Sequence, residues 1–200
     1  MLVNELYDSV ADEYEGLINS SKVNAQLVSK LKEIFDKYKI TVGSILDLGC
    51  GPGNLKTTLG DNFSYTGIDV SKNMLEKAKQ KGYRVINGKI EDQLGKMPDK
   101  SFDYIVSLST FHFIKDIGSM ISELDRIAVK GWIISLADVT ESYARYFSVY
   151  APLYNHTKIL IPDLQEDETF LAWTSPFSGE KINERMVFKG MTDYLARSLI

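Results

Sequence analysis

Apolar residues recur at helical spacing in two stretches at the start of the chain. Between residues 22 and 38 they fall every three or four positions, as on the buried face of an amphipathic helix. These residues are Val23, Leu27, Leu31, Ile34, Phe35 and Tyr38. A weaker pattern of the same period predicts another helix over residues 3–19. We therefore expect two N-terminal helices that cap the rest of the domain.

Five short strand-like runs follow these helices, at residues 44–48, 65–70, 83–87, 102–108 and 131–138. Their starts are roughly 20 to 30 residues apart, which is the length of a strand and a crossover helix in a parallel βαβ unit. Runs such as WIISLA are almost continuously apolar, as is typical of parallel strands covered on both faces. The pattern predicts an α/β fold with a doubly wound, Rossmann-like and mostly parallel sheet of seven strands.

Two helices are predicted between these strands. One covers residues 72–81, with Ser71 as its N-cap and Gly82 just past its end. The other is expected to end at Gly131, and its apolar face comprises Ile117, Ile121, Leu124 and Ala128.

The pattern after residue 139 is less regular. A helical stretch at residues 142–156 is interrupted by Pro152, and a later capping box joins Asp163 to Glu166. Residues 184–190 and 192–200 predict a hairpin that closes the sheet. We expect a single domain in three parts: cap helices at 1–40, a core at 41–139, and a substrate-side segment with the C-terminal hairpin at 140–200.

Composition narrows the class of protein. The chain has 200 residues and a net charge of −4, and its Lys and Arg residues are scattered among acids, which disfavours a nucleic-acid surface. No apolar run approaches the roughly 20 residues that span a bilayer, and the acidic N-terminus lacks the order of a secretory signal. Cys50 is the only cysteine, which excludes an intrachain disulfide and a thiolate metal cluster. We expect a cytoplasmic protein without a membrane partner.

The stretch SILDLGCGPGN, residues 44–54, carries the most specific chemistry. Its glycines alternate at Gly49, Gly51 and Gly53, whereas the dinucleotide fingerprint G-x-G-x-x-G requires a third glycine at Asn54. Pro52 also removes a backbone N–H that a pyrophosphate would use, and no G-x-x-x-x-G-K-[ST] phosphate loop is present. A glycine turn after the first strand therefore indicates close approach to a ligand without a phosphate.

Two acids extend this interpretation. Asp47 directly precedes the glycines and suits a ligand that carries an ammonium group. Asp69 ends the second strand, where a carboxylate is placed to accept hydrogen bonds from ribose hydroxyls. The predicted ligand is a nucleoside with a cationic, amino-acid-like end.

These residues resemble the first two motifs of the class I S-adenosylmethionine-dependent methyltransferases. The segments VINGKIEDQL, DKSFDYIVSLSTFHFI and GWIISLADV follow in the order and spacing of that family, over roughly residues 40–140. The N-terminal LYDSVADEYE is similar to the family's cap segment, which often carries a Tyr near the cofactor; here it is Tyr14. The resemblance implies S-adenosyl-L-methionine as cofactor.

The resemblance also implies roles for individual residues. It places Asp47 near the ammonium group of the cofactor and Asp69 on the ribose. Backbone atoms of five residues are expected at the methionine moiety: Gly49, Cys50, Gly51, Ser107 and Leu108.

At the adenine, the resemblance places Val70 beside the ring and the N–H of Ile90 at its edge. Many relatives carry Asp directly after the glycine of this motif, where this chain has Lys89. The acid that binds the adenine is therefore Glu91 or Asp92, and both stay open.

His112 lies just beyond the fourth strand, near the position of the transferred methyl group. It could act as a general base, since an imidazole titrates near neutral pH. The alternative is a residue in the wall of the cofactor pocket, because many relatives carry His there. Nothing marks a base or an exposed thiolate beside Cys50, which indicates a small buried loop residue. An aromatic stripe is either core packing or part of the acceptor pocket: Tyr143, Tyr146, Phe147, Tyr150 and Tyr154.

The resemblance implies an enzyme that moves a methyl group to an O, N or C nucleophile of a small-molecule acceptor. The Asn/Asp-Pro-Pro-Tyr/Phe run of many adenine and amide methyltransferases is replaced by SLST at residues 107–110. Three alternatives stay open: a cofactor-binding module or partner subunit without turnover, a methyltransferase acting on protein or RNA, and a nicotinamide-dependent reductase, which the glycine spacing disfavours.

Overall fold

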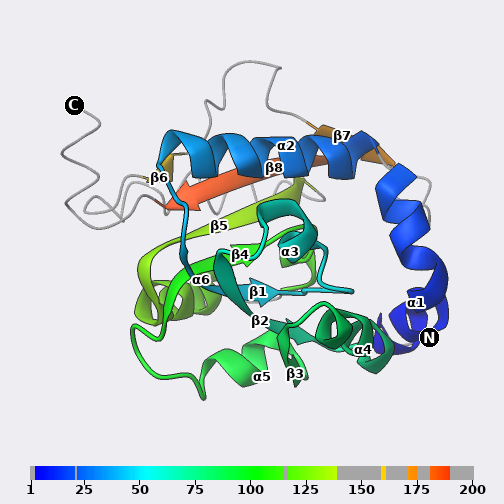
Figure 1. Ribbon diagram of the computed structural model, residues 1–200, viewed down its shortest axis with the longest axis horizontal. Helices are drawn as coiled ribbons and strands as arrows, with labels where there is room; N and C mark the ends of the chain where they lie inside the picture. Colours follow the sequence, from blue (N-terminus) through cyan, green and yellow to red (C-terminus); the bar gives the residue numbers. More distant parts are fainter. Residues whose placement is uncertain are drawn as a thin grey trace.

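A sheet with helices on both faces forms the centre of the protein (Figure 1). The computed structural model describes residues 3–20, 22–114, 117–138, 159–160, 171–174 and 181–189. Five strands are parallel and lie in the order β3-β2-β1-β4-β5. They are β1 (Gly43–Leu48), β2 (Phe63–Asp69), β3 (Arg84–Asn87), β4 (Phe102–Ser107) and β5 (Ala128–Asp138). The predicted α/β, Rossmann-like fold is confirmed.

Three further strands extend the sheet beyond β5. The strand β8 (Lys181–Lys189) pairs antiparallel with β5, while β6 (Ile159–Leu160) and β7 (Leu171–Thr174) pair with β8. The described sheet therefore has eight strands rather than the predicted seven, because two short strands share the second edge of β8. The predicted second arm of the hairpin, residues 192–200, lies outside the described residues.

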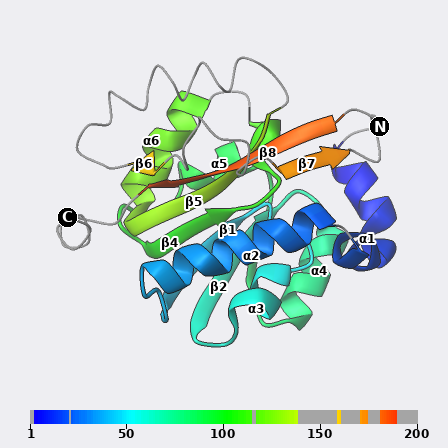
Figure 2. The same cartoon turned by 90° about the horizontal axis from the view of Figure 1, so that it is seen from above.

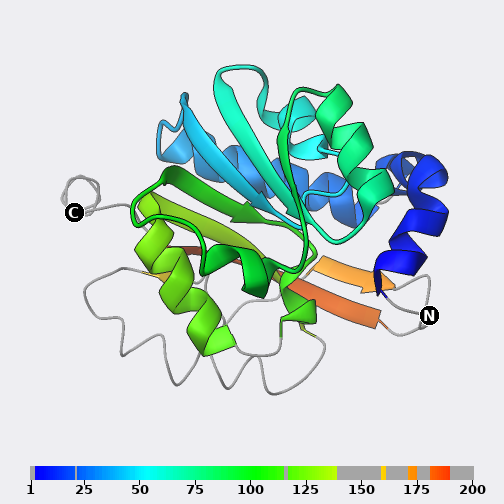
Figure 3. The ribbon, with the colours of Figure 1, turned by 90° about the horizontal axis from the view of Figure 1, so that it is seen from below.

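The helices divide into two layers, one on each face of the sheet (Figures 2 and 3). One layer contains α2 (Lys22–Lys37), α3 (Asn54–Leu59) and α4 (Lys72–Gln80); the other contains α5 (Ile90–Leu94) and α6 (Ile117–Ile127). Alternate side chains of β1 point to opposite layers, so Ile45 packs with the first and Leu46 with the second. Both are fully buried, as expected for a parallel sheet covered on both faces.

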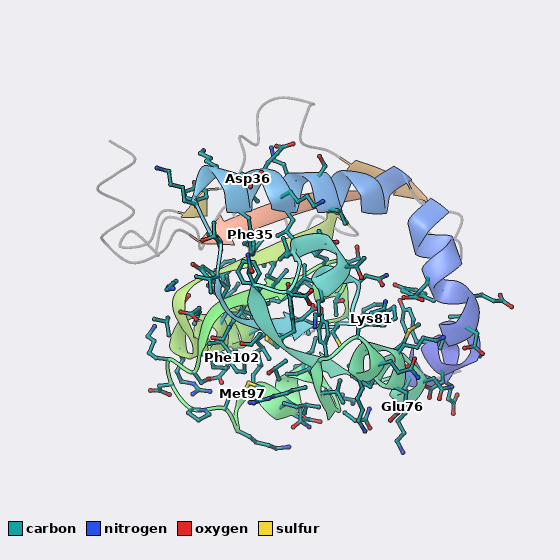
Figure 4. All side chains as sticks on the ribbon, viewed as in Figure 1. Phe35, Asp36, Glu76, Lys81, Met97 and Phe102 are labelled. Atoms are coloured by element: carbon teal, nitrogen blue, oxygen red, sulfur yellow. The ribbon has the colours of Figure 1, made fainter. Side chains whose placement is uncertain are left out.

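The helix predictions agree with the structure at most boundaries. The helix α2 buries Phe35 against the sheet, while the next residue, Asp36, points away from it (Figure 4). Ser71 caps α4 by accepting a hydrogen bond from the N–H of Met74 at 3.1 Å. Gly82, with φ 87°, follows the end of that helix, as predicted.

The predicted boundary at Gly131 is wrong. The helix α6 ends at Ile127, and Ala128 already belongs to β5, where it pairs with Phe102 of β4. The Lys100 ammonium donates a hydrogen bond to the Ala128 carbonyl at 2.7 Å, and the backbone N–H of Lys100 donates to the Arg126 carbonyl at 2.9 Å. These long-range bonds take up the carbonyls of Arg126 and Ala128, and the strand begins three residues earlier than predicted.

The helix α1 (Val3–Ser20) stands against α4 at the end of the sheet (Figure 1). The Asp8 carboxylate accepts hydrogen bonds from the Ser71 hydroxyl at 2.6 Å and from the Asn73 N–H at 3.1 Å. Lys77 pairs with Asp12 at 2.9 Å, and Lys81 pairs with Glu15. Three acids, spaced along one face of α1, thus bind successive turns of α4.

We expect Asp8→Ala to loosen α1, because the change removes both hydrogen bonds at the start of α4. Hydrogen exchange of the amides in residues 4–16 should become roughly five- to tenfold faster, since hydrogen bonds to a carboxylate are stabilising and these are partly exposed. The control is Asp12→Ala, which removes a single ion pair of a side chain that is 96% exposed. Equal acceleration in both variants would contradict a special role of Asp8.

Candidate functional site

The loop between β1 and α3 contains three glycines with positive φ. Gly49, Gly51 and Gly53 have φ values of 70°, 50° and 77°, a region that side-chain-bearing residues rarely adopt. At Gly49 a Cβ atom would lie 2.2 Å from the Thr110 hydroxyl oxygen, so the loop packs directly against the segment after β4. The alternation of glycines in the sequence is thus required by backbone conformation and by close approach.

Asp69, at the end of β2, joins this loop to the start of α4. Its carboxylate accepts hydrogen bonds from the N–H of Gly51 and the N–H of Ser71, both at 2.9 Å. Burial raises the pKa of Asp69, and the backbone hydrogen bonds oppose that shift. The carboxyl group therefore lies at the carboxyl ends of β1 and β2, where parallel sheets bind ligands.

A pocket of about 310 Å³ opens at this edge of the sheet, next to α1. Its wall combines the glycine loop, the ends of β2 and β4, the start of α5 and two tyrosines of α1. The lining residues are Tyr7, Tyr14, Gly49, Gly51, Asp69, Val70, Met74, Gly88, Lys89, Ile90, Glu91, Leu108, Ser109, Thr110, Phe113 and Ile114. A cavity of this size with few polar groups is typical of a small-molecule site.

Most residues named from the sequence meet at this pocket. Its wall includes Tyr14, Gly49, Gly51, Asp69, Val70, Ile90, Glu91 and Leu108. Of the two acids offered for the adenine, Glu91 lines the pocket and Asp92 does not. His112 belongs to the short 3-10 helix η1 (Phe111–Phe113), but its side chain lies outside the described part of the structure.

Three predicted residues lie behind the wall rather than in it. Asp47 is 5% exposed and accepts a hydrogen bond from the Tyr83 hydroxyl at 3.0 Å. Burial raises the pKa of Asp47 to about 7, although the Tyr83 hydrogen bond opposes the shift. Ser107 is fully buried and donates to the Leu48 carbonyl at 3.0 Å, which ties the end of β4 to the end of β1.

Cys50 is the third residue behind the wall. Its thiol donates a weak hydrogen bond to the Gly51 carbonyl at 3.5 Å, and a Cβ atom at Gly67 of β2 would lie only 2.4 Å from its sulfur. Burial raises the pKa of the Cys50 thiol, and the carboxyl groups of Asp47 and Asp69 raise it further. The thiolate is the nucleophilic form of cysteine, and a raised pKa disfavours it. Cys50 is therefore a packing residue.

Several wall residues were not identified from the sequence. Tyr7, Met74, Gly88, Ser109, Thr110, Phe113 and Ile114 belong to this group, while Lys89 was noted only as a departure from the family pattern. Ser109 has φ 53°, and its N–H donates to the Ser135 hydroxyl of β5 at 2.6 Å. The usable signal was proximity to the motifs: these residues lie within a few positions of the strand ends, or in the same helix as Tyr14.

Within the described residues, His, Cys, Asp and Glu side chains form no group of three that could hold a metal ion. None of the described helices is long and apolar enough to cross a membrane.

Comparison with known proteins agrees with this geometry. The methyltransferase domain family matches residues 46–135, which contain the glycine loop, Asp69 and β4. The matched segment comprises 90 of the 200 residues, and over it the chain is similar to the methyltransferase domain family. The resemblance noted from the sequence is thereby confirmed, and with it S-adenosylmethionine as the cofactor that it implies.

Two curated relatives differ in how much they share with this chain. Malonyl-[acyl-carrier protein] O-methyltransferase of Legionella pneumophila is 31% identical over 131 residues, 62% of this chain. The chain spans 45% of the length of that relative. Demethylmenaquinone methyltransferase of Staphylococcus aureus is 25% identical over 92% of this chain and 82% of its own length.

Solved structures of methyltransferases share the fold of this chain. Magnesium protoporphyrin IX methyltransferase from Synechocystis, with bound S-adenosylmethionine, superimposes with a TM-score of 0.61 at 17% identity. The match covers 94% of this chain and 95% of that chain. A solved structure from Methanococcus maripaludis gives the same TM-score and identity over 94% of both chains.

We expect Asp47→Asn to change the pH dependence of stability. A carboxyl group with a pKa near 7 in the folded state and near 3.8 in the unfolded state loses stability as the pH rises through this interval. The variant keeps an acceptor for Tyr83 but cannot ionise. The unfolding free energy of the variant minus that of the wild type should therefore increase by roughly 1 to 4 kcal/mol between pH 4 and pH 8.

Denaturant unfolding of the ligand-free protein across this pH range is the measurement for Asp47→Asn. The control is Asp61→Asn, whose side chain is 90% exposed and which should leave the pH profile of the wild type unchanged. A pH-independent difference between Asp47→Asn and the wild type would show that Asp47 is ionised throughout.

Gly49→Ala should weaken binding of S-adenosylmethionine, because the added Cβ atom would displace Thr110, another wall residue. Calorimetric titration should show at least a tenfold loss of affinity. The matched control is Gly60→Ala, which also has positive φ but open space around the added Cβ. That variant should cost roughly 1 to 3 kcal/mol of stability through backbone strain and retain cofactor affinity.

Proposed function

We propose that this methyltransferase transfers the methyl group of S-adenosylmethionine to an O, N or C nucleophile of a small-molecule acceptor. One observation carries the proposal: a single pocket joins the glycine loop, Asp69 and the end of β4. The family match over residues 46–135 supports it. The relatives named above methylate, by their names, a malonyl carrier, a quinone precursor and a porphyrin, so the acceptor differs among them.

The wall residues fit S-adenosylmethionine, which carries no phosphate group. In this proposal Gly49 and Gly51 allow the methionine end to approach the backbone, and the Asp69 carboxyl accepts hydrogen bonds from the ribose hydroxyls. Leu108 closes the methionine end, and Tyr14 covers the loop from α1.

The adenine end of the pocket is the start of α5. We assign Val70 to a position beside the adenine ring, and the N–H of Ile90 and the Glu91 side chain to the edge of the ring, because all three residues line the pocket. Lys89, in the position where many relatives carry an acid, also lines the pocket.

Asp47, Cys50 and Ser107 act in this proposal as supports of the loop. The Tyr83 hydroxyl donates to Asp47 and accepts the N–H of Lys56 at 3.2 Å, so Asp47 is linked to the first turn of α3. In this proposal Asp47 influences the ammonium group of the cofactor from beneath the loop.

When bound, the cofactor supplies a methyl group that is already electrophilic. The chain has to align the acceptor and exclude water, and alignment of this kind reaches effective concentrations of about 10⁵ M or more in model reactions. A general base is needed only for acceptors that keep their proton at neutral pH, and His112 is our candidate for it. Thr110 and Phe113, on either side of His112, line the pocket.

We also propose the division of the domain into cap helices (1–40), cofactor core (41–139) and substrate-side segment (140–200). The antiparallel pairing of β8 with β5 supports a sheet closed at its C-terminal edge. A hairpin of β8 with residues 192–200, and a cytoplasmic location, belong to the same proposal.

Methyl transfer is tested by incubating the protein with S-adenosylmethionine that carries a labelled methyl group and a panel of small acceptors. Label should appear in an acceptor in the presence of wild-type protein and be lost with Gly49→Ala. Binding of the cofactor with no transfer to any small molecule, protein or RNA would instead identify a binding module or partner subunit. Tight binding of NAD without binding of S-adenosylmethionine would refute the proposal.

Asp69→Ala should weaken the binding of S-adenosylmethionine by roughly 1.5 to 3 kcal/mol, the cost of removing a charged hydrogen-bond acceptor from its partners. The change also removes the bonds from Gly51 and Ser71, so melting curves should be recorded for each variant. Asp36→Ala, on the exposed side of α2, is the control and should retain affinity. An unchanged affinity of Asp69→Ala would show that this carboxyl does not contact the ligand.

A further inference from the structure

Three aromatic rings from two distant parts of the sequence meet at one wall of the pocket. Tyr7 and Tyr14 come from α1, and Phe113 comes from η1. The ring centroids of Tyr7 and Tyr14 are 5.9 Å apart with planes at 79°, and those of Tyr7 and Phe113 are 6.4 Å apart with planes at 90°. Tyr7 therefore stands nearly perpendicular to both of the other rings. We call these three residues the aromatic corner.

The aromatic corner lies beside the glycine loop and the acid at the end of β2. The Tyr14 ring is 3.9 Å from the position of a Cβ atom at Gly51, so it covers the glycine loop. Burial raises the pKa of the Tyr7 hydroxyl, and the nearby Asp69 carboxyl raises it further. The corner thus faces the junction between the glycine loop and the acid at the end of β2.

Perpendicular rings around a cavity are suited to an organic cation. The face of each ring carries negative charge density, and a cation within about 6 Å of a centroid is attracted to it. The attraction is larger where water is excluded, and Tyr7 is half-buried while Phe113, at 44% exposure, lies nearer to solvent. The Asp69 carboxyl beside Tyr7 adds negative potential, whereas an uncharged ligand would be held equally well by aliphatic walls.

We propose that Tyr7, Tyr14 and Phe113 bind a positively charged onium group at the junction of the pocket. The inference rests on the proposed function, which supplies two sources of such a group: the sulfonium of the cofactor and an ammonium group of an amine acceptor. Both are compact cations bordered by carbon, and both lie at the reacting end of the pocket. After transfer of the methyl group the sulfonium becomes a neutral thioether, so the corner binds the product less tightly than the cofactor.

The first arm of the test compares S-adenosylmethionine with S-adenosylhomocysteine, which differ by the methyl group and the charge. Calorimetric titration of Tyr7→Leu and Phe113→Leu should show a loss of about 3- to 30-fold in affinity for the sulfonium compound. Affinity for the thioether should change less than twofold. The matched control is Tyr7→Phe, which keeps the ring and should keep the preference of the wild type.

The second arm titrates tetramethylammonium into protein saturated with S-adenosylhomocysteine. Binding that is weakened in Tyr7→Leu and Phe113→Leu but retained in Tyr7→Phe, with an unchanged preference between the two cofactor forms, would assign the corner to an amine acceptor. A shifted cofactor preference would assign it to the sulfonium. Melting curves confirm folding, and Phe113→Leu at a half-exposed position keeps the test usable if Tyr7→Leu unfolds.

The proposal is overturned if both variants lose affinity for the two cofactor forms equally, or lose none, and tetramethylammonium binding is unaffected. A wild type that binds neither S-adenosylmethionine nor S-adenosylhomocysteine would refute the proposed function instead. The tetramethylammonium titration, performed then on the free protein, would still decide whether the aromatic corner binds cations.

Discussion

The Asp69 carboxylate determines how the parts around the pocket are joined. It accepts one N–H from the glycine loop and one from Ser71, so the loop after β1 and the start of α4 are held by the same group. Ser71 caps α4 with its hydroxyl oxygen and donates the hydroxyl hydrogen to Asp8 of α1. A single chain of hydrogen bonds thus runs from the sheet to the helix that carries Tyr7 and Tyr14.

A second network supports the loop from below. Tyr83 donates to Asp47, accepts the N–H of Lys56 and stacks on Tyr65 with ring centroids 5.1 Å apart. Lys81 bonds both the Asn54 side chain at 2.7 Å and Glu15 of α1. Since the first network acts through β2 and the second through α3 and α4, the glycine loop is fixed from two sides before any ligand binds. This arrangement favours a preformed pocket.

Local patterns in the sequence predicted most of the fold. Apolar runs located all five parallel strands, because strands covered on both faces need apolar residues at nearly every position. The boundary at Ala128 was missed because bonds from Lys100, nearly thirty positions earlier, decide where α6 ends. Asp47 was placed at the ligand because it precedes the glycines. Which way its side chain points depends on the alternation within β1 and on Tyr83, and neither is visible in the motif itself.

The contact between Cys50 and Gly67 restricts how this sequence can vary. Position 67 has no room for a methyl group, because the Cys50 sulfur would lie 2.4 Å and the Tyr83 ring 3.0 Å from it. The Tyr83 ring also lies 2.9 Å from a Cβ atom at Gly53. The family motif, the second strand and the turn before β3 therefore share one small volume. A larger side chain at one of these positions requires a smaller one at another, so substitutions here are expected to be inherited in pairs.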